Sequence, residues 1–207
     1  MKKNSVLVLL LFSTFLVADG LHFGEPIMNG PGCSPGSVSW ALSPSNNSLS
    51  ILFGTFSLTA NPDSGLKRSY CEIITQVSTH NQTLIEADYR GFHDLPIEAI
   101  SDWRVSYSLD NNAIVSRLDS AIGDDINPHT YSHQVNITCN GTRMLRIFAE
   151  NILTSSSTDR NATDTLDSID LGQANTPDIA LQICNGASHI SLVIPALMSA
   201  LFILFSI

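Results

Sequence analysis

Several segments of the chain alternate apolar and polar residues with a period of two. The clearest are residues 38–42 (VSWAL), 103–109 (WRVSYSL) and 131–139 (YSHQVNITC). Weaker versions occur at 49–53, 85–90, 145–149 and 179–183, and no stretch shows a convincing helical spacing. Period-two alternation is typical of β-strands that bury one face. The pattern therefore predicts short strands throughout the chain.

Turn-forming residues separate these segments, at 61–65 (NPDSG), 110–112 (DNN), 123–125 (GDD) and 154–159 (TSSSTD). Eight to ten short strands joined by polar turns predict an all-β fold: an antiparallel β-sandwich or jelly-roll-like single domain. The Ser/Thr-rich stretch 154–165 is expected to be a long loop inside this domain, because a strand pattern and Cys184 follow it.

Both ends of the chain are apolar. Residues 6–17 follow two lysines and precede Ala-Asp-Gly, which is the pattern of a signal peptide over residues 1–20. Residues 190–207 carry no charge and have no basic flank. Residues 186–207 are therefore expected to be a lipid-anchor signal that is cleaved off, with the lipid attached at Asn185 or Gly186. A retained membrane helix is the alternative. The predicted sandwich domain is residues 21–185.

The chain has four cysteines, Cys33, Cys71, Cys139 and Cys184. In a secreted chain an even number predicts two disulfides, for which three pairings exist, and the spacings match no zinc motif. We favour Cys33–Cys71 and Cys139–Cys184, each closing a loop of about 40 residues that contributes roughly 4 kcal/mol.

N-glycosylation sequons begin at five asparagines of the predicted domain. One sequon arises easily by chance, but several in one small secreted domain indicate real glycosylation. In residues 131–139 the sequon asparagine falls on the polar side of the predicted strand, where a glycan reaches solvent. The predicted glycosylation sites are Asn46, Asn81, Asn136, Asn140 and Asn161.

The charge balance is acidic, with 19 Asp and Glu against 10 Lys and Arg and a net charge of −9. This excess argues against nucleic acid as a partner, because binding phosphate needs Lys and Arg. The expected partners are an extracellular glycan or protein, and the membrane through the C-terminal tail or a lipid anchor.

Two groups of residues raise the question of a metal ion. His129 and His133 lie on one side of the predicted strand, but about 13 Å apart, too far for one zinc ion, so we interpret them as structural histidines. Asp119, Asp124 and Asp125 in and near a turn are candidate Ca²⁺ ligands, although a solvated acidic turn explains them better. No other cofactor is predicted.

Two further groups are candidates for binding. Glu86, Asp88 and Arg90 lie on one side of a predicted strand, either as a polar strip for a ligand or as surface ion pairs. Trp40 and Trp103 occupy apolar positions and are expected in the core rather than on a sugar-stacking surface.

The order of these motifs resembles a known family, the secreted proteins grouped as domain of unknown function 4360, found in fungi and some other organisms. The matching motifs span almost the whole predicted domain, although the tryptophans expected before the third and fourth cysteines are missing here. The resemblance implies a small secreted β-rich domain and supplies no catalytic residues. The motifs are GCSPGSV at 32–38, LSP at 42–44, KRSYC at 67–71, DYRGF at 88–92, CNG at 139–141 and LQIC at 181–184.

The chain contains no His-Glu-x-x-His pair and no phosphate-binding glycine loop. We therefore expect a non-enzymatic secreted or cell-surface domain that binds an extracellular glycan, a wall or matrix component, or a protein. The alternative is a secreted hydrolase of extracellular polymers, which requires two carboxylates about 5–10 Å apart across a groove.

Overall fold

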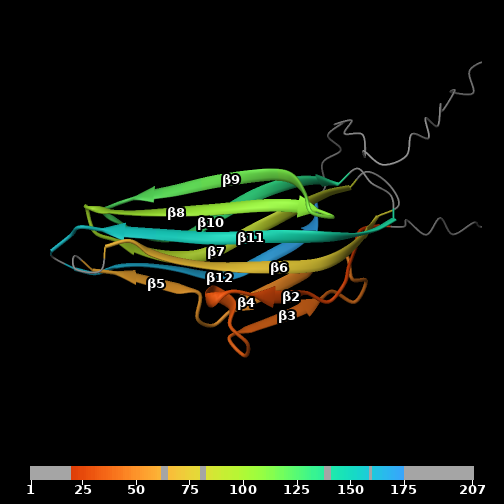
Figure 1. Ribbon diagram of the computed structural model, residues 1–207, viewed down its shortest axis with the longest axis horizontal. Coiled ribbons are helices and arrows are strands. Elements are labelled where there is room, and N and C mark those ends of the chain that lie inside the picture. The colour runs from red at the N-terminus through yellow and green to blue at the C-terminus, as the bar shows by residue number, and fades with distance from the viewer. Residues whose placement is uncertain (1–19, 62–64, 80–82, 138–140, 159, 175–207) are drawn as a thin grey trace, which may run out of the picture.

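The computed structural model describes residues 20–61, 65–79, 83–137, 141–158 and 160–174. Their long elements are β-strands, arranged in two antiparallel sheets. Sheet A contains β1 (His22–Phe23), β2 (Ile27–Asn29), β6 (Lys67–Thr79), β8 (Ala99–Leu109), β9 (Asn112–Ile122) and β11 (Gly141–Ser155). Sheet B contains β3 (Val38–Leu42), β4 (Leu49–Phe53), β5 (Ser57–Ala60), β7 (Thr83–Leu95), β10 (Asp125–Ile137) and β12 (Ala162–Gln173). The predicted all-β sandwich is confirmed (Figure 1).

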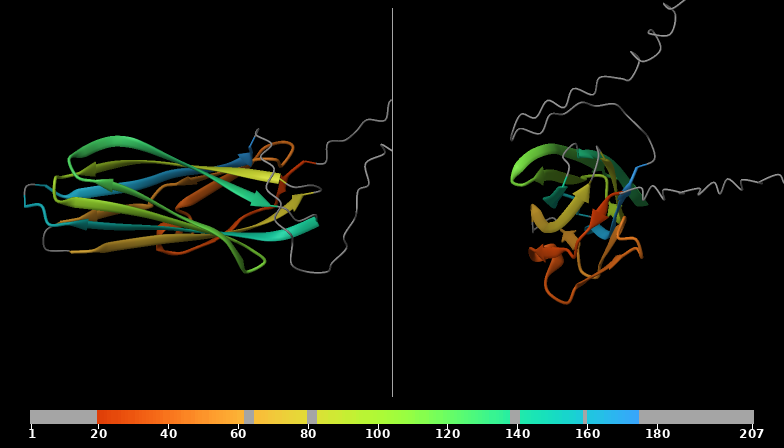
Figure 2. Two further views of the ribbon diagram at one scale, coloured as in Figure 1. Left: turned by 90° about the horizontal axis from the view of Figure 1, so that it is seen from above. Right: turned by 90° about the vertical axis from the view of Figure 1, so that its right-hand side faces the viewer.

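The two sheets face each other, as the end-on view in Figure 2 shows. Sheet A has the order β1-β6-β11-β8-β9 and sheet B the order β10-β7-β12-β4-β3. The chain crosses between the sheets after β2, β5, β6, β7, β9, β10 and β11, whereas β8 and β9 form a hairpin. The order β6-β11-β8-β9 opposite β4-β12-β7-β10 is the winding of a jelly roll.

The strands from β6 to β12 are longer than predicted, with 11 to 15 residues each. β11 continues to Ser155 and β12 already begins at Ala162. The long loop expected at 154–165 is therefore wrong, because both of its ends continue as paired strands. The short connection leaves Asp164 inside β12 rather than in solvent.

The main core lies between the inner faces of the two sheets. From β8 the main core receives Trp103, Val105 and Tyr107, which are apolar positions of the period-two pattern. A second apolar cluster at one end of the sandwich contains Ala60, Leu95, Ala99, Ala121, Leu153 and Ala162. The long strands thus supply side chains to two separate apolar clusters.

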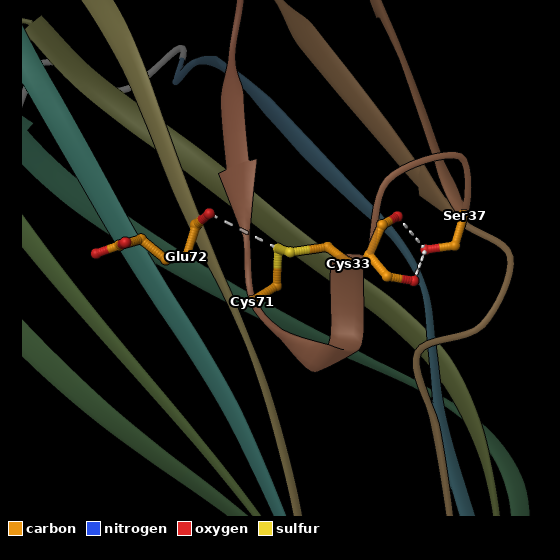
Figure 3. Close-up of a disulfide and its surroundings, with 5 residues drawn as sticks. Cys33, Ser37, Cys71 and Glu72 are labelled. Atoms are coloured by element: carbon orange, nitrogen blue, oxygen red, sulfur yellow. Dashed lines mark hydrogen bonds between the residues drawn. A yellow bond between two sulfur atoms is a disulfide. The ribbon is translucent and has the colours of Figure 1, made fainter.

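A disulfide joins Cys33 to Cys71, as predicted (Figure 3). Cys33 ends the short 3-10 helix η1 (Pro31–Cys33), and Cys71 lies on the inner face of β6. The bridge spans 38 residues of sequence and fixes the N-terminal segment to sheet A. Both cysteines are buried, at 3 % and 0 % exposure.

Several predicted features lie outside the described residues. These are the signal peptide, the C-terminal tail with Asn185 and Gly186, the cysteines Cys139 and Cys184, and the sequon residues Asn81 and Asn140. The second disulfide therefore stays a prediction. In the described part of the chain, no helix has the length and apolar character needed to cross a membrane.

The Cys33–Cys71 bridge should carry a large share of the stability. Replacing both cysteines by serine is expected to lower the free energy of unfolding by about 4 kcal/mol, because the unfolded chain regains the entropy of the open loop. Urea unfolding measures this loss. The exposed edge-strand variant Ser39→Ala is the control and should change the value by less than about 0.5 kcal/mol. A loss of the same small size in the cysteine variant would contradict the prediction.

Candidate functional site

Two aromatic side chains form a platform on the outer face of sheet A. Tyr70 of β6 and Phe148 of β11 are half-buried and stack with ring centroids 5.2 Å apart and planes at 27°. They are diagonal neighbours, since Phe148 pairs with Glu72. Gly30 packs behind Tyr70, because a Cβ at residue 30 would lie 3.0 Å from ring carbons of Tyr70. The sequence analysis did not single out this Tyr70–Phe148 platform.

Two ion pairs between β6 and β11 flank the platform. Arg146 pairs with Glu72, and Arg68 pairs with Glu150. The carboxylate side chains are only 15 % and 8 % exposed, whereas the two arginine side chains are 49 % and 58 % exposed. The carboxylates therefore hold the guanidinium groups at the surface, beside the aromatic rings.

A hollow of about 210 Å³ opens next to the platform. Its lining consists of Phe148 and Arg146 from β11 and Ser106 and Ser108 from β8. One wall is thus an aromatic ring and the others are hydrogen-bonding groups. Small-molecule sites typically combine an apolar surface with a few placed polar groups in this way.

The outer face of sheet A also exposes large aliphatic side chains. They are spread along the face and do not form one patch, since Ile100 pairs with Thr154, ten residues along β11 from Met144, and single exposed apolar side chains are normal on a protein surface. The exposed apolar side chains on this face are Ile27, Ile100, Leu118, Ile122 and Met144.

The predicted polar strip lies on the outer face of sheet B, where β7 places Glu86, Asp88 and Arg90 on its solvent side. Arg90 Nη1 lies 2.9 Å from Asp170 Oδ2, and Arg90 Nη2 lies 3.5 Å from Asp88 Oδ2. Ser132 Oγ donates a hydrogen bond to Asp88. Asp88 and Arg90 are therefore engaged in cross-strand pairs. This agrees with the interpretation of these residues as surface ion pairs rather than as a strip for a ligand.

The candidate calcium ligands do not come together. Asp119 accepts a hydrogen bond from His133, and Asp125 accepts one from His93. Asp124 lies in the turn before β10 with a φ of 66°. Among the described residues, the group of three that does lie close enough to share an ion is a different one, His93, His129 and Asp164.

The two tryptophans differ. Trp103 is 2 % exposed and belongs to the core, as predicted. Trp40 is 38 % exposed, so its predicted core position is wrong. Trp40 has the inward parity of its strand, but β3 is the edge of sheet B and has a neighbouring strand, β4, on one side only.

The described sequon residues reach solvent to different degrees. Asn46 and Asn161 are exposed in loops, and Asn136 is half-buried on the outer side of β10. The parity predicted for Asn136 is correct. Glycosylation at all five sequons stays a prediction.

A layer of buried polar side chains separates the two apolar clusters, and the sequence analysis missed most of it. Five strands contribute one residue each: His93 from β7, Ser101 from β8, His129 from β10, Asn151 from β11 and Asp164 from β12. Each is less than 9 % exposed. A sequence signal existed for His93, which shares the parity of the buried residues 85, 87 and 89.

The Asp164 carboxyl group lies at the centre of this polar layer. Its Oδ2 accepts hydrogen bonds from Trp103 Nε1, at 2.9 Å, and from Ser101 Oγ. Burial raises the pKa of the Asp164 carboxyl, and the hydrogen bond from Ser101 opposes that rise. Burial lowers the pKa of the neighbouring His129 imidazole.

A second buried network surrounds His133. Tyr89 Oη lies 2.8 Å from Tyr107 Oη, and Tyr107 Oη lies 3.0 Å from His133 Nδ1. His133 Nε2 donates to Asp119 Oδ2 at 2.7 Å. Tyr107 then donates to Nδ1 and accepts from Tyr89. Burial raises the pKa of both phenols, which keeps them protonated. The structural role predicted for His133 is confirmed.

Comparison with known proteins gives one family. The family model described as "Domain of unknown function (DUF4360)" matches residues 23–184. No curated protein sequence matches the chain.

Similar solved structures include TmCBM61 in complex with β-1,4-galactotriose, at 9 % identity and a TM-score of 0.36, covering 74 % of this chain and 91 % of that chain. The CBM36-1 domain of a multidomain xylanase from the hindgut metagenome of Trinervitermes trinervoides has 8 % identity and a TM-score of 0.27, covering 58 % and 99 %. The C-terminal CBM6 of LamC, a marine laminarinase from Zobellia galactanivorans, has 13 % identity and a TM-score of 0.25, covering 56 % and 98 %. These TM-scores are too low to assign a ligand to this chain.

The network around His133 predicts unequal effects of removing its two hydroxyls. Tyr107→Phe should lower the free energy of unfolding by about 2–4 kcal/mol, because it leaves both His133 Nδ1 and the Tyr89 hydroxyl without a partner. Tyr89→Phe removes one bond at the end of the chain of hydrogen bonds and should cost about 1 kcal/mol. Urea unfolding of the two variants, which lose the same atom type, measures the difference. Equal losses would contradict the bonding order.

Proposed function

We propose that this chain, which belongs to the DUF4360 family, is a non-enzymatic extracellular module that binds a glycan through the outer face of sheet A. The observation that carries the proposal is the Tyr70–Phe148 platform with the Arg146–Glu72 ion pair and the adjoining hollow. A sugar ring presents a face of C–H groups and a rim of hydroxyls. An aromatic ring can stack on the C–H face, and the charged and hydroxyl groups can form hydrogen bonds with the hydroxyl rim.

The polar groups beside the platform are prepared for hydrogen bonding. Glu72 holds the guanidinium of Arg146 in place, so less side-chain entropy is lost when a ligand binds. Ser106 lies opposite Phe148 on the neighbouring strand and adds a hydroxyl to the hollow. Tyr70 lies against Gly30 and stacks on Phe148, so it supports the Phe148 ring that lines the hollow.

The arrangement suits binding better than hydrolysis. A glycosidase needs a carboxylic acid free to protonate the leaving oxygen and a second carboxylate facing it. The two carboxylates beside the platform, Glu72 and Glu150, are each paired with an arginine and largely buried. Both are therefore committed to holding the arginines.

The extracellular location in this proposal is supported by the Cys33–Cys71 disulfide, because disulfides persist in oxidising compartments. The exposed sequon residues Asn46 and Asn161 agree with passage through the secretory pathway. Attachment to the membrane is part of the same proposal, either by a lipid anchor at Asn185 or Gly186 or by a helix retained in residues 186–207.

Binding should depend on sheet A and not on sheet B. The secreted chain is screened against immobilised glycans and cell-wall polymers, and the best glycan is then titrated by calorimetry. Phe148→Ala and Arg146→Ala are expected to weaken binding at least ten-fold, because each removes one of the two kinds of contact to the sugar. Arg90→Ala and Phe92→Ala on the outer face of sheet B are the matched controls and should bind as the wild type does.

Three results would overturn the proposal: no binding to any polymer, unchanged binding in the sheet A variants, or release of shortened glycan products during incubation. Circular dichroism and thermal unfolding of each variant separate loss of the binding surface from loss of the fold.

A further inference from the structure

Inside the sandwich, the polar layer contains lone-pair atoms that lack partners among the described residues. They are both ring nitrogens of His129, Nδ1 of His93 and Oδ1 of Asp164. The side chains of His129 and Asp164 are 6 % and 0 % exposed. Buried polar atoms are nearly always paired, so unpaired ones clustered together indicate a missing binding partner.

These atoms converge from neighbouring strands of sheet B. β10, β7 and β12 are adjacent, and His93 stands directly opposite Asp164. One ligand atom from each of the three residues lies within 4.8 Å of the others. Gly91 makes room for the His129 ring, because a Cβ at residue 91 would lie 2.8 Å from His129 Nε2 and 1.9 Å from the Thr165 carbonyl oxygen.

The remaining polar atoms of two of these residues are already bonded in the way that orients metal ligands. His93 Nε2 lies 2.9 Å from Asp125 Oδ2 and donates to it, which leaves Nδ1 without a hydrogen-bond partner among the described residues, and the His93 ring stacks on that of His129 with centroids 5.1 Å apart. Asp164 Oδ2 accepts from Trp103 and Ser101, which leaves Oδ1 on the side of His129, 4.0 Å from its Nδ1. Metal-binding histidines and carboxylates typically have such outer partners.

We propose that His93, His129 and Asp164 bind one divalent transition-metal ion, represented by Zn²⁺, in the interior of the sandwich. Two imidazoles and one carboxylate are a common zinc ligand set with one position left for water, whereas Ca²⁺ takes oxygen ligands. The ion compensates the buried negative charge of Asp164. It also ties β7, β10 and β12 together, which is a role independent of glycan binding.

The test uses the full secreted chain after dialysis against a chelator. Calorimetry and elemental analysis should find one Zn²⁺ per chain, and the midpoint of thermal unfolding should rise when Zn²⁺ is added. Asp164→Asn and His129→Gln are expected to lower the affinity at least 100-fold. His133→Gln is the matched control, because His133 is a buried histidine of the same strand whose nitrogens bond to Tyr107 and Asp119. It should bind Zn²⁺ as the wild type does.

A second measurement covers the case in which a ligand variant fails to fold. In the wild type, imidazole NMR signals of His93 and His129 should shift on addition of Zn²⁺, while those of the exposed His22 stay unchanged. The proposal is overturned if the folded wild type takes up no Zn²⁺ and still takes up none after refolding in the presence of Zn²⁺ with the Cys33–Cys71 disulfide intact. Binding that survives in Asp164→Asn, or signals that shift only at His22, would overturn it as well.

Discussion

The burial of the Asp164 carboxylate is the constraint on which the arrangement of the two sheets depends. A carboxylate that leaves water without partners costs several kcal/mol. The donors Trp103 and Ser101 come from β8 of the opposite sheet. Sliding one sheet along the other by two residues, about 7 Å, would remove both donors and leave the charge bare. Apolar side chains hold the sheets together, but this polar contact specifies how they are aligned.

The same alignment determines what the outer surface presents. Successive residues of a strand point to opposite faces, so the inner position of a residue fixes the outer position of its neighbour. In β11 Ala149 lies in the core opposite Val105, and this register places Phe148 on the outer face between Glu72 and Ser106. The Tyr70–Phe148 platform is thus a consequence of the registers of β6, β8 and β11. A one-residue slip would turn the aromatic ring into the core.

Alternation in the sequence was sufficient to predict strands 38–42 and 103–109, the two-sheet fold and the outward position of Asn136. It failed for Trp40, because parity gives the direction of a side chain but not whether a further strand covers it. It also failed for Asp164, which lies in a Ser/Thr-rich stretch that resembles a loop. Its donors are 61 and 63 residues away in sequence, and only the jelly-roll winding brings them together. Buried polar contacts of this kind leave no local pattern.

The two histidines of β10 show why chemistry has to be assigned from partners and not from position. His129 and His133 lie on the same strand, face inward and are 8 % and 5 % exposed. Both nitrogens of His133 have partners, Tyr107 and Asp119, so its ring is fully used in holding the sheets together. Neither nitrogen of His129 has a hydrogen-bond partner within the described part of the chain. Since a buried imidazole without partners is costly, the difference between the two environments assigns a structural role to His133 and an available lone pair to His129.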